Sequence, residues 1–142
     1  MGRVLERGSV MLDSLSEKLA TQPRRVFLMD GLGAVVSALA LGVGLPAIQP
    51  LIGMPREVLS LLAAIPVGYA VYSLGCAARL PAKWPNWLRG IALLNAGYAG
   101  FSVAMLAVHA AQIQPLGWAY FVGEILLLAG LAPLEWKIAA RG

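Results

Sequence analysis

The sequence has little charge for its 142 residues. Asp, Glu, Lys and Arg make up 13% of the chain, against about 25% in an average soluble domain. Hydrophobic residues make up 59%, and the mean hydropathy is +0.75. A chain of this size with so few polar groups would expose far too much apolar surface to water. The composition therefore excludes a soluble domain and places the chain in lipid.

Cysteine and histidine are each present only once. The single Cys76 excludes an internal disulfide and any paired-cysteine redox or zinc site. No second ligand stands at metal-binding spacing from His109, so we predict no metal site. The sequence identifies no cofactor. The formal charge is +4, but the basic residues stand between apolar runs, where they act as topology signals, so nucleic acid is not an expected partner.

Four apolar runs are long enough to cross a bilayer, which takes about 20 mostly apolar residues. The predicted spans cover about residues 26–45, 55–79, 87–110 and 116–137. The link between the last two is short, which favours antiparallel neighbours. We therefore expect an all-α fold, a four-transmembrane-helix antiparallel bundle. The proline-rich link 46–55 should not continue as helix, and Pro133 should break the last helix near its end.

The positive charges predict the orientation of this bundle. Of the 11 Lys and Arg residues, all except Arg56 lie in residues 1–25, in or beside the link between the second and third spans, or at the C-terminal end. Because cytoplasmic segments carry the excess of positive charge, both termini should face the cytoplasm. The chain divides into an N-terminal cytoplasmic or interfacial segment, 1–25, and a membrane domain, 26–142.

The N-terminal segment contains leucines at helical spacing. Leu12, Leu15 and Leu19 recur every three or four residues, with charged and polar residues on the other side. This pattern predicts a short amphipathic helix over residues 10–20, lying on the membrane surface. The alternative is a flexible basic tail that only sets topology.

Two features of the first two spans concern helix packing. Ala34, Ala38 and Gly42 lie four residues apart and form a smooth strip, which lets a neighbouring helix approach closely. The strip predicts either an internal contact or the seam of a homodimer. Pro66 lies inside the second span and leaves the carbonyl of Leu62 without its usual donor, so we expect a bend there.

Polar side chains inside the spans need partners, because hydrocarbon offers none. The candidate binding or proton-relay residues are Glu124, Asp30, Asn95, Tyr98, Tyr72 and Glu135. The predicted topology places most of the polar residues in the cytoplasmic half of the bilayer, namely Asp30, Tyr72, Ser73, Asn95 and Glu135. Asp30 has two interpretations. It is either an interfacial residue that caps the helix or pairs with Arg24 or Arg25, or it is an acid of a functional site.

Glu124 is predicted to lie closest to the bilayer midplane. A charged acid near the centre costs at least about 2.5–3.5 kcal/mol on insertion scales, so Glu124 should face the bundle interior or a wet cavity. We expect a neutral Glu124 that donates a hydrogen bond to Ser37 or Ser102. Glu135 lies about three turns away, roughly 16 Å along the helix, and close to Lys137. Glu135 is therefore expected to be an interfacial residue, which leaves Glu124 as the lone deep acid.

Several short stretches carry a resemblance to a known group of proteins. They are Asp30-Gly31-Leu32-Gly33-Ala34 within residues 28–37, Gly53-Met54-Pro55, Tyr72-Ser73, Asn95 with Tyr98, and Tyr120-Phe121 with Glu124. Over about residues 26–137 the chain resembles a family of small uncharacterised four-helix bacterial inner-membrane proteins. The resemblance implies four spans and a location in the bacterial inner (plasma) membrane. It implies no activity and does not cover the N-terminal segment.

Three functions remain open at this point. The first, which we favour, is a non-enzymatic accessory, structural or binding protein whose polar seam holds the bundle together or docks a larger membrane complex. The second is a proton-linked transporter or channel for a small solute, with Glu124 as proton carrier and Asp30 or Glu135 as relay. The third is a membrane enzyme acting on a lipid or quinone, although no nucleophile or metal set stands out and no catalytic residue is predicted.

Overall fold

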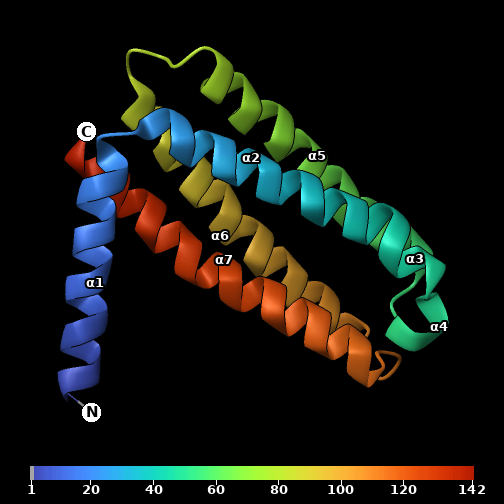
Figure 1. Ribbon diagram of the computed structural model, residues 1–142. Coiled ribbons are helices and arrows are strands. Elements are labelled where there is room, and N and C mark those ends of the chain that lie inside the picture. Colours follow the sequence, from blue (N-terminus) through green and yellow to red (C-terminus); the bar gives the residue numbers. More distant parts are fainter. Residues whose placement is uncertain (1) are drawn as a thin grey trace.

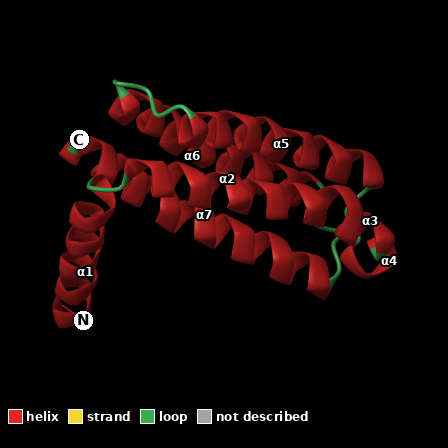
Figure 2. Ribbon diagram, turned by 45° about the horizontal axis from the view of Figure 1, so that its top comes forward, coloured by secondary structure: helices red, strands yellow, loops and turns green. Residues whose placement is uncertain are grey.

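The computed structural model describes residues 2–142, and this part of the chain consists of helices joined by short loops (Figure 2). The elements in chain order are α1 (Gly2–Ala20), α2 (Pro23–Leu39), the π-helical segment η1 (Ala40–Gly44), α3 (Leu45–Ala47), α4 (Gln49–Ile52), α5 (Arg56–Ala78), α6 (Trp84–Val108) and α7 (Pro115–Arg141). No strand occurs among residues 2–142, so the all-α prediction is confirmed.

Four helical stretches are long and apolar enough to cross a membrane. They are Pro23–Ala47, Arg56–Ala78, Trp84–Val108 and Pro115–Arg141. Large apolar side chains such as Val36, Leu93 and Leu126 are mostly exposed on their outer surface, as expected for helices that face lipid rather than water. The chain therefore has the helices of a multi-pass membrane protein.

Two prolines that were predicted to end helices lie within helical segments. Pro46 lies in α3, which follows η1 directly, and the continuous helical stretch ends one residue later, at Ala47. The prediction that the link 46–55 does not continue the first span is therefore confirmed from Ile48 on, but the link itself contains the short helix α4. Pro133 does not break α7, which continues to Arg141 because Ile138 and Ala139 beyond it are buried in the core.

The long helices pack as two pairs (Figure 1). α2 lies chiefly against α5 and α6 chiefly against α7, while α5 and α6 share a smaller contact. α2 lies close to α5 at Gly31, where an added Cβ would lie 2.7 Å from the side chain of Leu74. In the strip predicted from small residues, Gly42 faces Ala63 of α5. This part of the strip is thus an internal contact.

The apolar core is divided into two clusters along the bundle. The cluster nearer α4 includes Leu41, Leu62 and Phe121. The cluster nearer the C-terminus includes Phe27, Leu88 and Ile138. In each of the four long helical stretches, at least one polar residue of the site described below lies in the sequence between members of the two clusters.

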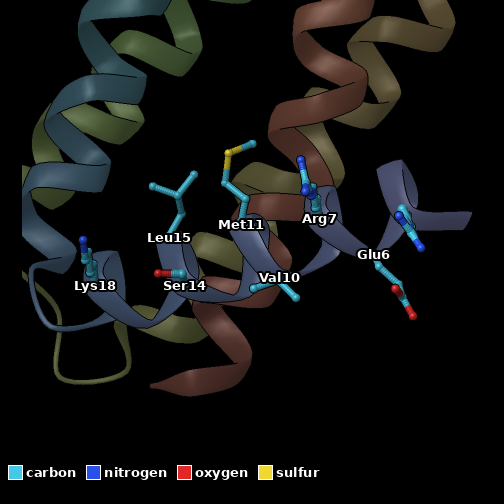
Figure 3. Close-up of a pocket in the computed structure, with 8 residues that line it drawn as sticks. Glu6, Arg7, Val10, Met11, Ser14, Leu15 and Lys18 are labelled. Carbon is cyan, nitrogen blue, oxygen red and sulfur yellow. The ribbon is translucent and has the colours of Figure 1, made fainter. Parts of the chain in front are cut away.

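α1 extends away from the bundle at the end where the C-terminus lies (Figure 1). Its C-terminal half is held to α7 by ion pairs from Lys137 to Asp13 at 3.1 Å and from Arg141 to Glu17 at 3.2 Å. The predicted helix is confirmed and is longer than expected, and the alternative of a flexible tail is wrong. Figure 3 shows Arg7, Met11 and Leu15 extending from one side of α1, along a shallow groove.

The opposite end of the bundle is closed by a tight contact between α4 and the start of α7. The N–H of Gln114 donates to the carbonyl of Ile52 at 2.9 Å. Gly53 ends α4 with a φ of 86°, a left-handed conformation that favours glycine. A Cβ on Gly117 would clash with the same Ile52 carbonyl. This corner therefore joins the α2/α5 pair to the α6/α7 pair.

Candidate functional site

Each of the four long helices contributes one polar side chain to a single layer. The members of this polar layer are Asp30 of α2, Ser73 of α5, Asn95 of α6 and Glu135 of α7. The Ser73 hydroxyl donates to Asp30 Oδ2 at 2.5 Å. The Asn95 amide donates to Glu135 Oε1 at 2.7 Å and, over a longer 3.4 Å, to Asp30 Oδ1. Asn95 thus links the acids of α2 and α7.

The polar layer corrects two predictions about its acids. Glu135 was expected at the membrane interface, but its side chain is only 1% exposed and accepts a hydrogen bond from Asn95. The prediction is wrong because α7 continues past Pro133 and α1 packs against this end of the helix. Asp30 was expected to be either a cap or ion-pair residue, or a site acid. Its partners are Ser73 and Asn95, and within residues 2–142 it forms no ion pair.

Glu124 lies at a second level of α7, about three helical turns from Glu135. Its side chain is partly buried, and its Oε2 atom is buried without a hydrogen-bond partner in the described part of the chain. The hydroxyls of Ser37 and Tyr98 lie close to this carboxyl group. Ser102, the other expected partner, lies beside Tyr98, and its Oγ is buried without a partner among residues 2–142.

A cavity of about 250 Å³ connects the two levels. Its polar lining includes Asp30, Asn95 and Glu135 of the polar layer, together with Glu124. Glu124 is therefore not the lone acid of the interior, because three acids line one cavity. The remainder of the wall is mostly aliphatic and comes largely from leucines of α7.

The cavity opens between α2 and α7. Met29 of α2 and Leu127 of α7 both line it, yet they are 64% and 68% exposed on the outer surface. α2 and α7 make little direct contact, and α6 passes behind the space between them in Figure 1. The mouth of the cavity thus faces sideways, onto the apolar exterior of the bundle, and Ala34 of the predicted strip lies inside it.

The cavity wall is rich in acids and contains no Lys, Arg or His. The three ion pairs found within residues 2–142 all join α1 to α7, and none involves Asp30, Glu124 or Glu135. The described residues therefore bring no positive charge to these carboxyl groups. Such a wall can hold protons or bind a positively charged group.

Tyr98 lies between the two levels and has a structural role. Its hydroxyl donates to the carbonyl of Leu62 over 3.4 Å. This is the carbonyl that Pro66 leaves without a backbone donor. α5 continues as one helix through Pro66, and the side chain of a neighbouring helix supplies the missing hydrogen bond.

The other two tyrosines of this region differ in their surroundings. Tyr72, a predicted site residue, is not part of the cavity wall. Its hydroxyl donates to the carbonyl of Trp87 at 3.0 Å, and the two rings pack with centroids 5.4 Å apart. Tyr69, which was not among the predicted site residues, lines the cavity and donates to the carbonyl of Leu94 at 2.7 Å. The sequence did contain a signal for Tyr69, because it lies three residues after Pro66 and therefore on the same face of the helix as that proline.

No group of three or more His, Cys, Asp or Glu side chains in residues 2–142 is arranged to hold a metal ion. Comparisons with protein-family models, curated proteins and solved structures found no match to this chain. The resemblance to small four-helix bacterial membrane proteins therefore stays a prediction, and the function is inferred from the site itself.

Proposed function

We propose that the chain is a non-enzymatic membrane-embedded binding protein that holds a small ligand in the cavity between α2 and α7. The observation that carries this proposal is the Oε2 atom of Glu135. Glu135 is 1% exposed and lines the cavity. Its Oε2 atom has no hydrogen-bond partner among residues 2–142. A buried polar group without a partner costs about 1–3 kcal/mol, and more if charged. A ligand that pairs with this oxygen removes that cost.

The composition of the wall supports binding. Ligand sites are usually apolar pockets with a few convergent polar groups. Here aliphatic side chains surround three carboxyl groups, one amide and the phenols of Tyr69 and Tyr98. Asn95 keeps two of the carboxyl groups in place by hydrogen bonds from its amide. The polar groups are therefore positioned before a ligand binds.

The proposal includes a membrane topology. The four long helices cross a bacterial inner membrane as an antiparallel bundle, with both termini on the cytoplasmic side. The distribution of Lys and Arg supports this orientation, because Arg56 alone lies in the links assigned to the other side. α1 then lies on the cytoplasmic surface, where Arg7 and Lys18 of its groove (Figure 3) contact anionic head groups.

The binding proposal can be tested by obstructing the cavity. Gly33 lines the cavity at an exposed position of α2, and a Cβ added there would meet no atom within 4 Å, so Gly33→Phe adds a ring at the edge of the cavity without a clash. Gly68 of α5 is equally exposed and free of neighbours but does not line the cavity, which makes Gly68→Phe a matched control. The measurement is native mass spectrometry of the protein purified in mild detergent.

We expect a small molecule to accompany the unmodified protein and Gly68→Phe. The affinity of Gly33→Phe for this molecule should fall by about tenfold or more, which corresponds to about 1.4 kcal/mol of lost binding free energy, and its occupancy should fall accordingly. The proposal is wrong if no molecule accompanies the unmodified protein, or if the two variants retain it equally.

Proton-linked transport of a small solute is the second candidate function. It is favoured by the position of Glu124, which shares one cavity with Asp30 and Glu135. Transport predicts a pH-dependent solute flux into proteoliposomes that Glu124→Gln abolishes. Binding alone predicts a retained ligand and no flux in either protein.

A further inference from the structure

We propose that the ligand of the cavity is an amphipathic organic cation that reaches the site from the lipid, through the mouth between α2 and α7. This inference rests on the proposed binding function and names its ligand class. It is argued from the charge of the wall, from its hydrogen bonds and from the position of its mouth.

The charge of the wall favours a cation. Asp30, Glu124 and Glu135 line the cavity, and no basic side chain does. In a medium of low dielectric constant the attraction between opposite charges is several times stronger than in water. Taking a carboxylate out of water costs several kcal/mol, which is offset only by a close partner. A positively charged ligand supplies the partner that the cavity wall lacks.

In the described part of the chain, the hydrogen bonds leave two carboxyl oxygens of the cavity unpaired, one on Glu124 and one on Glu135, and Glu135 is the more deeply buried of the two residues. Asn95 has one amide group for two acids, and it donates to Asp30 Oδ1 and Glu135 Oε1. Ser73 donates to the second oxygen of Asp30. Oε2 of Glu135 remains without a donor among residues 2–142. An ammonium N–H group placed in the cavity would donate to this oxygen.

The rest of the wall favours an organic cation over a metal ion. A metal ion requires several ligating side chains that converge on one point. Among residues 2–142, no cluster of three or more His, Cys, Asp or Glu side chains is arranged in this way. The cavity is instead walled by aliphatic side chains such as Leu128 and Leu131, with the rings of Tyr69 and Tyr98 meeting edge to face at 6.1 Å between centroids. Alkyl groups pack well against leucines, and aromatic faces attract cations.

The position and size of the cavity indicate an amphipathic ligand. Its mouth is flanked by the exposed side chains of Met29 and Leu127, so the site is reached from the apolar surface of the bundle. Its volume of about 250 Å³ is slightly below the roughly 300–1,000 Å³ of typical ligand pockets. The cavity therefore accepts a compact charged head, while a longer apolar tail stays between α2 and α7.

The test compares two probes of the same shape. Protonated N,N-dimethylbenzylamine is an amphipathic cation with one N–H group, and isobutylbenzene carries a carbon atom in place of the nitrogen. Both are titrated into the full-length protein in nanodiscs of zwitterionic lipid, and binding is followed by saturation-transfer NMR. We expect the cation to bind at least about tenfold more tightly than the neutral probe. This comparison uses the unmodified protein and does not depend on the folding of any variant.

Two matched pairs of variants locate the site and the route. Glu135→Gln should weaken cation binding by about tenfold or more, whereas Glu57→Gln, at an exposed acid of the first turn of α5, should not change it. Leu127→Trp at the mouth should slow association of the cation. Leu126→Trp, at an equally exposed position that does not line the cavity, should not.

The outcomes separate this inference from the proposed function. Equal binding of the two probes, or equal effects of Glu135→Gln and Glu57→Gln, would overturn the cation and leave the binding function in place. A lipid acyl chain or a second copy of this chain found between α2 and α7 in the purified protein would also overturn it. If neither probe binds, the cation inference is wrong. If no molecule accompanies the purified protein, the proposed function is wrong.

Discussion

The polar layer and Glu124 line the same cavity but differ in the support that they receive from neighbouring helices. In the polar layer, Asp30 accepts hydrogen bonds from Ser73 and Asn95, and Glu135 accepts one from Asn95. Glu124 lies close to the hydroxyls of Ser37 and Tyr98, and like Glu135 it has one oxygen that is buried without a partner in the described residues. All three are acids inside predicted spans. What separates them is Asn95, which donates to Asp30 and Glu135 at once and so joins α2 to α7 through α6, whereas Glu124 has no such shared donor among residues 2–142.

The largest effect on stability is expected when the polar layer loses its shared donor. Asn95→Leu removes both amide hydrogen bonds and leaves Asp30 and Glu135 with unpaired oxygens. The free energy of unfolding should fall by about 1–3 kcal/mol, measured by unfolding in mixed micelles with increasing mole fraction of dodecyl sulfate. Ser102→Ala is the control on the same helix, because the Ser102 hydroxyl has no partner among residues 2–142. Equal unfolding midpoints for the two variants would contradict the role of Asn95.

A smaller effect is expected at Tyr98, between the two levels. Tyr98→Phe removes the hydroxyl that donates to the Leu62 carbonyl and should cost about 0.5–1.5 kcal/mol of unfolding free energy. Pro66→Ala returns a backbone N–H to the same carbonyl. In a double-mutant cycle, Tyr98→Phe should therefore cost less in the Pro66→Ala background than in the unmodified chain. An identical cost in both backgrounds would show that this hydrogen bond contributes nothing.

The smallest effect is expected outside the cavity, where polar contacts remain in water. Asp13→Asn weakens the contacts of α1 with Lys137 and Arg141, whose side chains are partly exposed. Exposed ion pairs contribute about 0.2–1 kcal/mol and are screened by salt. Hydrogen exchange of α1 should be faster in Asp13→Asn than in Glu6→Gln, an acid of α1 that forms no ion pair within residues 2–142. The difference should vanish at about 1 M salt, where the Debye length is about 3 Å.

The four apolar helices could be predicted because hydropathy over about 20 residues depends only on local composition. Their ends were predicted to within a few residues, but the continuation of α7 past Pro133 depends on contacts made elsewhere in the fold. Glu135 was placed at the interface because it lies close to Lys137, although it belongs to the polar layer with Asn95. Its burial depends on contacts between distant parts of the chain, among them the contact of α1 with α7.

The rotation of α5 was a second limit of prediction. Tyr69 and Tyr72 lie three residues apart and have the same chemistry, but only Tyr69 lines the cavity. Which of them does so depends on how α5 is rotated about its axis, and contacts such as that of Gly31 with Leu74 belong to the interface that fixes this rotation. Such a contact between distant residues has no periodic signal in the sequence.

The π-helical segment Ala40–Gly44 has a consequence for the evolution of the chain. A π-helical turn contains one residue more than the α-helical turn it replaces, and each residue of an α-helix adds a rotation of about 100°. Deleting one residue here, such as the exposed Val43, would replace the π-helical turn with an ordinary α-helical turn. Because the extra residue is accommodated within that one wider turn, Leu45 would keep nearly the same direction relative to Asp30. A deletion elsewhere in α2 would instead rotate all following residues by about 100°. Single-residue deletions should therefore be tolerated in this segment far more often than in the rest of α2.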